Sequence, residues 1–160
     1  MLRDATDVDF PAILALNTES VRFTSPLDEA RLRALHAQAA YHRVAEIDGT
    51  AIAFLLALRE GADYDSPNYR WFAQRYDTFL YIDRVVVGSA CQGRGVGALL
   101  YEDLFTFARA SGVEQVTCEF DLQPPNPTSA AFHARFGFRE VGTQWPAGGK
   151  KQVSLQACSL

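Results

Sequence analysis

Residues 85–104 read VVVGSACQGRGVGALLYEDL, and this stretch predicts a strand, a loop and a helix in direct succession. Three consecutive valines lead into a short loop with glycine at positions 93, 95 and 97, and the loop runs directly into apolar residues at helical spacing. A strand, a glycine loop and a helix in this order expose backbone N–H groups at the positive end of a helix dipole. The stretch therefore predicts an anion site, with phosphate or pyrophosphate as its natural occupant.

Capping and turn signals before this stretch predict two helices and a β-hairpin. The first helix begins near residue 7, where Asp-Val-Asp-Phe-Pro precedes apolar residues, and the second covers residues 27–40. Residues 41–60 read as two strands around Asp48-Gly49, which is a strong turn signal. Residues 61–78 are polar, aromatic and irregular, and so long a connection is more often functional than idle.

The middle of the chain predicts a crossover connection. Residues 80–87 form a strand, and the helix after the glycine loop ends at Gly112, which suits a C-terminal cap. One face of this helix is apolar and consists of Val96, Leu99, Leu100, Leu104, Phe107 and Ala108.

The end of the chain predicts another strand, a helix and a closing hairpin. Residues 113–121 alternate with a period of two, with Val116, Cys118 and Phe120 on one face. A helix begins at Asn126-Pro127 and ends near Gly137, and two further strands follow it. This order of elements predicts a mixed α/β sheet.

The composition is typical of a soluble globular protein. Hydrophobic residues make up 48% and charged residues 21% of 160 residues, so a single domain covering residues 1–160 is expected. The net charge is -4 and the pI about 5.3, so no nucleic-acid partner is expected. No apolar run reaches membrane-spanning length and the first residues do not resemble a signal segment, so we expect a cytoplasmic protein that does not contact membranes.

Disulfide bonds and bound metals are not expected. The three cysteines, Cys91, Cys118 and Cys158, are too few and too far apart for a disulfide framework or a zinc site. His36 and His42 are too isolated to indicate a metal and are interpreted as surface or packing residues. A lone cysteine beside a turn is usually inert, so we do not expect an acyl-cysteine at Cys91.

Two families of phosphate-binding loops do not fit residues 92–97. A Walker loop ends in Gly-Lys-Ser/Thr, whereas this loop ends in Gly-Val-Gly-Ala. A dinucleotide-binding fingerprint has the spacing GxGxxG, whereas the spacing here is GxGxG. The chain that follows the loop is also too short for the second half of a dinucleotide fold.

A third family fits at two places. Gln92-x-x-Gly95-x-Gly97 resembles the Q/R-x-x-G-x-G/A motif of the GNAT superfamily of acetyl-CoA-dependent N-acetyltransferases. Residues 126–142, NPTSAAFHARFGFREVG, resemble the family's N-x-x-A-x-x-x-Y-x-x-x-G-F signature. The resemblance covers nearly the whole chain. It implies an α+β type of α/β fold, with a mixed, mostly antiparallel central sheet that is flanked by helices and splayed at the motif strand.

The resemblance also implies which residues bind acetyl-CoA. The pyrophosphate would lie on the loop amides, and the pantetheine arm would pair with the motif strand, whose main-chain N–H groups polarise the thioester carbonyl. Asn126 takes the position of an asparagine that contacts the coenzyme arm, or it only caps its helix. The coenzyme-binding residues implied are Val85, Val86, Val87, Gln92, Gly93, Arg94, Gly95, Val96, Gly97 and Asn126.

The catalytic residues are less clearly implied. His133 stands where the family usually has a tyrosine that protonates the leaving thiolate; an imidazolium could do the same, or His133 only packs there. Asp83 is the first candidate for the base and Glu119 on the neighbouring strand the second, while Tyr81 could orient substrate or water. The alternative for Asp83 is an ion pair with an arginine such as Arg84.

The acceptor side is expected to include aromatic residues. The candidates are Phe23 and, in the 61–78 connection, Tyr64, Trp71 and Tyr76, with Glu119 nearby. These rings could form a lid that excludes water, or they could make a dimer contact. The resemblance therefore implies direct acetyl transfer from acetyl-CoA to a primary amine of a small molecule, amino acid or peptide, by a monomer or homodimer. The alternative is a coenzyme A-binding regulatory or sensor protein with little turnover.

Overall fold

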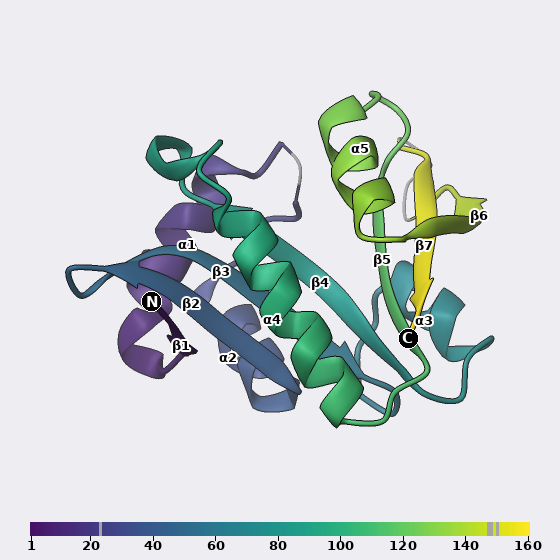
Figure 1. Cartoon of the computed structure of the whole chain (residues 1–160), viewed down its shortest axis with the longest axis horizontal. Helices are drawn as coiled ribbons and strands as arrows, with labels where there is room; N and C mark the ends of the chain where they lie inside the picture. The colour runs from purple at the N-terminus through teal and green to yellow at the C-terminus, as the bar shows by residue number, and fades with distance from the viewer. Residues whose placement is uncertain (23, 147–148, 150) are drawn as a thin grey trace. The chain divides into compact units, whose positions relative to one another are not determined.

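A computed structural model describes residues 1–160 except 23, 147–148 and 150 (Figure 1). The contacts between residues divide the chain into two compact units. The first unit contains residues 1–58 and 82–110, and the second contains residues 59–81 and 111–160. Strand β4 (Phe79–Val87) begins in the second unit and continues into the first.

In the first unit, β1 (Leu2–Asp4) and β2 (Tyr41–Ile47) are antiparallel, and β2 is antiparallel to β3 (Thr50–Arg59). The predicted hairpin is confirmed. Its turn holds Asp48 at φ 51° and Gly49 at φ 78°, a left-handed conformation that aspartate and glycine tolerate. The sequence analysis did not predict β1, because a strand of three residues leaves almost no periodic signal.

The helices of the first unit are α1 (Phe10–Glu19), α2 (Glu29–Gln38) and α4 (Val96–Ala110). Alternate side chains of β2 point to opposite faces: the Tyr41 hydroxyl donates to Asp103 of α4 at 2.7 Å, while His42 contacts α2. The predicted apolar face of α4 is wrong at Leu99, which is 54% exposed. Tyr101 and Phe105 are buried instead, so the buried stripe is turned away from Leu99 and towards these two residues.

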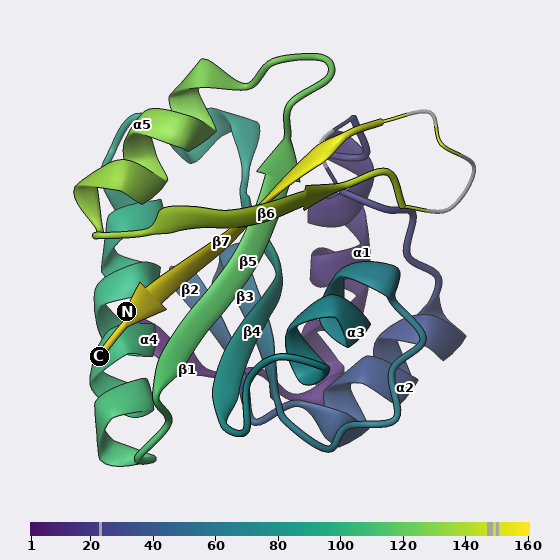
Figure 2. The same ribbon diagram turned by 90° about the vertical axis from the view of Figure 1, so that its right-hand side faces the viewer.

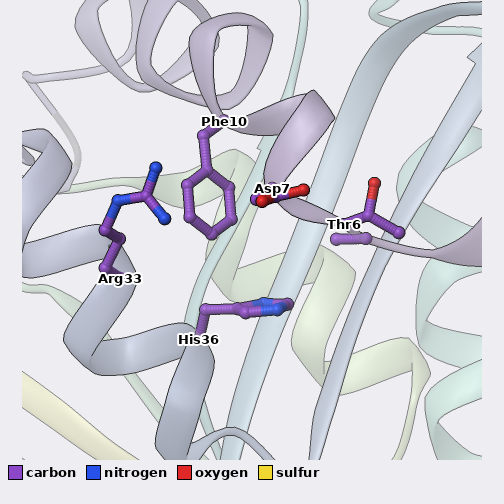
Figure 3. A pocket seen from close by; sticks show the side chains of 6 residues that line it. Thr6, Asp7, Phe10, Arg33 and His36 are labelled. Carbon is purple, nitrogen blue, oxygen red and sulfur yellow. The ribbon is translucent and has the colours of Figure 1, made fainter.

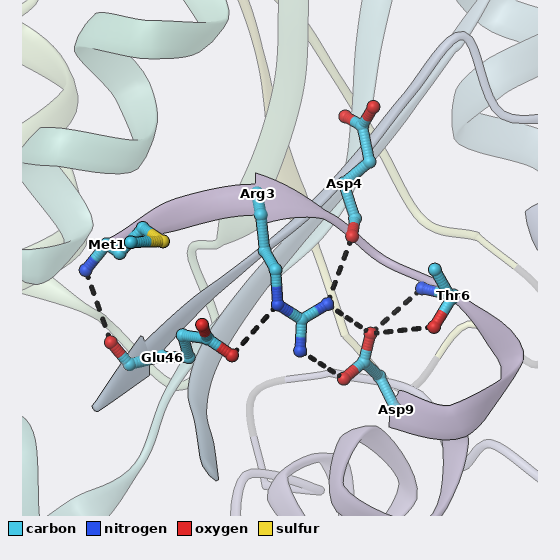
Figure 4. A network of polar contacts seen from close by, with 6 residues as sticks. All are labelled: Met1, Arg3, Asp4, Thr6, Asp9 and Glu46. Atoms are coloured by element: carbon cyan, nitrogen blue, oxygen red, sulfur yellow. Dashed lines mark hydrogen bonds and ion pairs between the residues drawn. The ribbon is translucent and has the colours of Figure 1, made fainter. Parts of the chain in front are cut away.

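A buried carboxylate fixes the start of α1 (Figure 4). Asp9 accepts two hydrogen bonds from the Arg3 guanidinium, at 2.7 and 2.8 Å, and one from the backbone N–H of Thr6 at 2.8 Å. Arg3 also donates to Glu46 of β2 at 2.9 Å. The Arg3 guanidinium holds the pKa of Asp9 below its ordinary value, so this carboxylate stays charged and ties β1, β2 and the start of α1 together.

The second unit contains the first residues of β4, then β5 (Gln115–Asp121), β6 (Arg139–Gln144) and β7 (Val153–Ser159), with helix α5 (Pro127–Arg135) (Figure 2). It also contains α3 (Pro67–Ala73), within the connection that was predicted to be irregular. The prediction was wrong there because the helix is short. Ser66 caps it by accepting from the backbone N–H of Tyr69 at 3.3 Å, and Pro67 suits its first turn.

The strands follow the order β1-β2-β3-β4-β5-β7-β6 in a seven-stranded sheet. The β4–β5 pair is parallel and the pairs β1–β2, β2–β3, β5–β7 and β6–β7 are antiparallel, which confirms the predicted mixed, mostly antiparallel sheet. The β4–β5 ladder has three residue pairs and ends at Tyr81 and Thr117. Within the described residues, no helix is both long enough and apolar enough to span a bilayer.

Candidate active site

The glycine loop lies between a short 3-10 turn (Ser89–Cys91) and α4 in the first unit. Gly93 and Gly95 have φ values of 77° and 78°, a conformation that other L residues rarely adopt. The N–H groups in the first turn of the 15-residue helix α4 have no intrahelical partners. Below the loop, the Gln92 side chain donates to the Val87 carbonyl at 3.2 Å and so ties the loop to the end of β4.

The space above the loop is open. A Cβ atom at Gly93 or Gly95 would meet no described atom within 4 Å, and residues 92–95 are exposed. A bare backbone in front of a helix N-terminus suits an anion, because the amide N–H groups and the helix dipole both favour negative charge. The residues present therefore fit a coenzyme pyrophosphate.

Asp83, the first candidate for the base, forms an ion pair. Its Oδ2 accepts from Arg84 Nε at 2.7 Å, and each of the two side chains is only 3% exposed. This is the alternative that the sequence analysis left open. The geometry therefore supports the ion-pair role of Asp83.

Four polar side chains from separate elements meet in the second unit. Glu119 Oε1 accepts from the Tyr81 hydroxyl at 2.7 Å and from Asn68 Nδ2 at 3.0 Å. Gln144 Nε2 donates to Asn68 Oδ1 at 2.8 Å. Tyr81 belongs to the last β4–β5 pair, and Glu119 is the next residue on the same face of β5. We call Tyr81, Glu119, Asn68 and Gln144 the Glu119 cluster.

Asn68 and Gln144 were not predicted from the sequence as site residues. They lie 51 and 25 positions from Glu119 along the chain, so no local spacing connects them. The Ser66-Pro67 pair before Asn68, which suits a helix start, could have indicated that this segment is ordered.

His133 is buried on α5. Its Nδ1 lies 2.7 Å from the Ser129 carbonyl oxygen and its ring packs edge-on against Phe132 and Phe138. Burial lowers the pKa of His133, and only the hydrogen bond to Ser129 opposes this effect. A neutral ring that donates through Nδ1 presents a lone pair at Nε2, so these contacts favour the packing alternative over the acid role.

Asn126 caps α5 as predicted. Its Oδ1 accepts from the backbone N–H of Ser129 at 3.2 Å. This bond uses only the side-chain oxygen. The amide NH₂ group keeps its donor capacity, so the proposed contact with a coenzyme arm is compatible with capping.

The aromatic acceptor candidates of the second unit pack against one another. Tyr64 is buried against Tyr69, and Tyr76 stacks on the buried ring of Phe72. The Trp71 indole fits against Gly142, where a Cβ atom would come within 2.5 Å, and the Arg75 guanidinium covers it at 3.7 Å. Phe23, the remaining candidate, lies outside the described residues. The contact of these aromatic residues with an acceptor stays a prediction.

The sequence profile of the Acetyltransferase (GNAT) family matches residues 8–138, which include the glycine loop and most of the downstream signature. The chain belongs to this family. The GNAT fold predicted from the two motifs is therefore confirmed, and acetyl-CoA is the co-substrate of the family.

Individual relatives of this GNAT chain differ in their named acceptors. Over 66 residues it is 42% identical to a phosphinothricin N-acetyltransferase of Streptomyces coelicolor, a match that spans 41% of this chain and only 37% of that protein. A ribosomal-protein-alanine N-acetyltransferase from Brucella melitensis is 23% identical, with a TM-score of 0.75 over 100% and 99% of the two chains. Ard1 from Thermoplasma volcanium is 14% identical, with a TM-score of 0.79 over 100% and 97%. At these identities, the two solved structures show only that this chain has the same fold.

In this GNAT chain, we expect His133→Phe to change turnover by less than about tenfold, because a buried neutral imidazole is a poor acid. The phenyl ring would keep the contacts with Phe132 and Phe138 but would lose the bond to Ser129. The turnover number and the Kd of coenzyme A should be measured for the variant. A loss of turnover above about a hundredfold with an unchanged Kd would return His133 to the acid role.

Two cavities of the first unit adjoin His36 and contain no residue of the glycine loop. One, of about 390 Å³, is lined by Ala5, Thr6, Asp7, Phe10, Arg33 and His36 (Figure 3). The other, of about 350 Å³, also contains His42. The Nδ1 atoms of His36 and His42 are 2.8 Å apart, so one ring donates to the other. Among the described residues, no group of three or more His, Cys, Asp or Glu could hold a metal.

The His42 ring makes the stability of the first unit depend on pH. Burial, and next the charge of His36, lower its pKa from 6.5 to about 4, and Asp9 opposes this effect. Folding therefore favours the neutral ring. Its contribution is fully present above pH 6.5 and is lost as the pH falls towards 4, with a limit of about 3 kcal/mol.

We expect the free energy of unfolding, measured by urea titration, to fall between pH 6.5 and pH 4. His42→Leu should flatten this dependence, while His36, at the other end of the hydrogen bond, stays in place. An equally steep dependence in His42→Leu would contradict the assignment.

Proposed function

We propose that this protein transfers the acetyl group of acetyl-CoA to the primary amine of a small molecule, an amino acid or a peptide, by direct attack in a ternary complex. One observation carries the proposal: Gly93 and Gly95 hold an open, exposed backbone in the left-handed conformation directly before α4. The family match supports the same donor.

The donor would be held mainly by the main chain. The amides of residues 92–97 would bind the pyrophosphate, and the main-chain groups of Val85, Val86 and Val87 would pair with the pantetheine arm. Arg94 is exposed on the loop and would add positive charge at its rim. Acetyl-CoA supplies the thioester; the protein supplies N–H donors to the thioester oxygen, where negative charge develops during attack.

Glu119 is our choice for the base. Its carboxylate is partly buried and is oriented by neutral donors, Tyr81 and Asn68, whereas Asp83 is neutralised by Arg84. The two hydrogen bonds fix the direction of the Glu119 carboxylate, and a fixed carboxylate can take a proton from an amine placed within hydrogen-bond reach. Glu119 would take the proton from the attacking amine, directly or through water, and Tyr81 would orient the carboxylate. The C–N bond would form as the C–S bond breaks, and coenzyme A would leave as a thiolate that takes a proton from water.

The names of the relatives suggest which amines to test first. Phosphinothricin represents the small-molecule class, and a short peptide with an N-terminal alanine represents the protein class. The primary test is thiol release from acetyl-CoA with each amine, together with thermal stabilisation by coenzyme A. Amine-dependent thiol release supports the proposal. Stabilisation without turnover on any amine would favour the regulatory or sensor alternative. The absence of both thiol release and stabilisation would contradict both functions.

A further inference from the structure

A buried arginine joins β4 to the segment that leads into α2. Arg84 Nη1 donates to Asn17 Oδ1 of α1 and to the Ser25 carbonyl, both at 3.1 Å, and Nη2 donates to Ser25 Oγ at 2.9 Å. Nε donates to Asp83 at 2.7 Å. Asn17 itself donates to the Ser25 carbonyl at 3.0 Å. Residues 24–28, which end at the N-cap of α2, are called the Ser25 segment.

The guanidinium has too many partners for a simple counter-ion of Asp83. Its side chain is 3% exposed, and all three of its nitrogens donate to protein groups. Burying a charge is costly unless its hydrogen bonds are made inside the protein. Two of the three acceptor groups beyond Asp83 belong to Ser25, so the geometry of the arginine is used chiefly to hold that residue.

The Ser25 segment lies beside the end of β4, the strand that leads to the glycine loop in the first unit. Arg84 and the valines 85–87 are consecutive residues of β4. The end of α1 also contacts this region, because the Ser89 N–H donates to Glu19 Oε1 at 3.3 Å. Gly88 approaches Leu16 so closely that a Cβ atom would lie 3.1 Å from its Cδ2 atom. The end of α1 and the Ser25 segment therefore border the carboxyl half of β4, the end of a strand where open α/β sheets bind ligands.

We propose that Arg84 is a positioning residue for the amine acceptor: it fixes the Ser25 segment beside β4 as one wall of the acceptor site. The inference rests on the proposed function, which places the thioester along Val85–Val87. The pyrophosphate is assigned to main-chain groups that Arg84 does not contact. We call the hydrogen bonds from Arg84 to Asn17 and Ser25 the Arg84 clamp. Weakening this clamp should therefore weaken acceptor binding and leave donor binding unchanged.

Two variants and one control test the clamp. Arg84→Lys keeps the charge but loses the planar fork that reaches Asp83, Asn17 and Ser25 together. Ser25→Ala removes only the hydroxyl acceptor and leaves the carbonyl contact, so it tests the clamp even if Arg84→Lys does not fold. Arg33→Lys is the control, because Arg33 is an exposed arginine of α2 that pairs with Glu29 across one turn, lies over the Phe10 ring and does not contact Ser25 in the described structure.

The measurements are KM for the acceptor, KM for acetyl-CoA and hydrogen exchange of the backbone N–H groups of Thr24, Ser25, Leu27 and Asp28. The acceptor probe is phosphinothricin, or the alanyl peptide if the unmodified protein acetylates it faster. We expect Arg84→Lys to raise the acceptor KM at least about tenfold and Ser25→Ala about threefold, as for lost hydrogen bonds to a charged group. KM for acetyl-CoA should stay within about twofold, and exchange should accelerate in both variants but not in Arg33→Lys.

The results separate this inference from the proposed function. Normal turnover with an unchanged acceptor KM in Ser25→Ala and in folded Arg84→Lys would overturn the clamp role alone, even if the melting temperature fell. A parallel rise of both KM values would also overturn it, because the effect would then not be confined to the acceptor. An unmodified protein that acetylates no amine would overturn the proposed function itself.

Discussion

We expect Gly95→Glu to abolish coenzyme A binding, with a loss of affinity of at least about a hundredfold. Gly95 has a φ of 78°, which costs a residue with a Cβ atom about 1–2 kcal/mol. The larger effect comes from charge, since the new carboxylate would stand beside the amides assigned to the pyrophosphate, and like charges in one site repel strongly. The Kd of coenzyme A, measured by calorimetry, is the direct readout.

Gly49→Glu is the matched control for this variant. Gly49 also has a φ of 78° and also has no described atom within 4 Å of a Cβ position, but it lies in the β2–β3 turn. The two variants therefore carry the same backbone strain and the same added charge. Coenzyme affinity that falls equally in both, or stays within about threefold in Gly95→Glu, would contradict the loop assignment.

The second large effect is expected for Glu119→Gln, which should lower turnover by about 10² to 10⁴. Glutamine keeps the size of the side chain and can still accept from Tyr81 and Asn68, but its amide cannot take a proton from an amine. The acidic limb of the pH–rate profile, where a carboxylate base becomes protonated, should move or disappear. The Kd of coenzyme A should not change.

Glu140→Gln is the control in the same unit. This variant also replaces a hydrogen-bonded carboxylate by an amide, because Glu140 accepts from the Ser154 hydroxyl at 2.6 Å. Asp83→Asn gives the opposing test. If it lowers turnover more than Glu119→Gln while both proteins stay folded, Asp83 is the base and the ion pair with Arg84 opens during the reaction.

Elements whose signals are local were predictable from the sequence. The β2–β3 turn, the Gly112 end of α4 and the Asn126 cap of α5 each depend on a few adjacent residues, and the structure has all three. Short elements were not predictable. Strand β1 has three residues and helix α3 has seven. These lengths are too short for a periodic pattern that would distinguish either element from a loop.

Side-chain burial was predictable only in part. The alternation of β5 places Thr117 on the face opposite Val116 and Cys118, and this side chain is nevertheless fully buried, because the second unit covers both faces of the strand. Asn68 packs on the face that carries Glu119, and His133 packs on the face that carries Phe120. A period of two in the sequence does not reveal whether the polar face is also covered.

The candidate site also has one part that could be predicted from the sequence and another part that could not. The glycine loop is continuous in the sequence, so its conformation could be predicted from six residues. The Glu119 cluster and the Arg84 clamp join residues that are distant along the chain, and Asn17, Ser25, Asn68 and Gln144 carry no signal of their own. Such polar networks become visible only once the elements are packed.

The exposed turn before α4 also bears on how this protein can change over evolutionary time. Peptide groups are common to every residue type, so many substitutions near the turn would leave the donor grip intact as long as Gly93 and Gly95 remain. Side chains elsewhere carry no such protection. Selection could then exchange one amine for another at the acceptor wall, through changes as small as a serine hydroxyl, without rebuilding the half of the reaction that supplies the acetyl group.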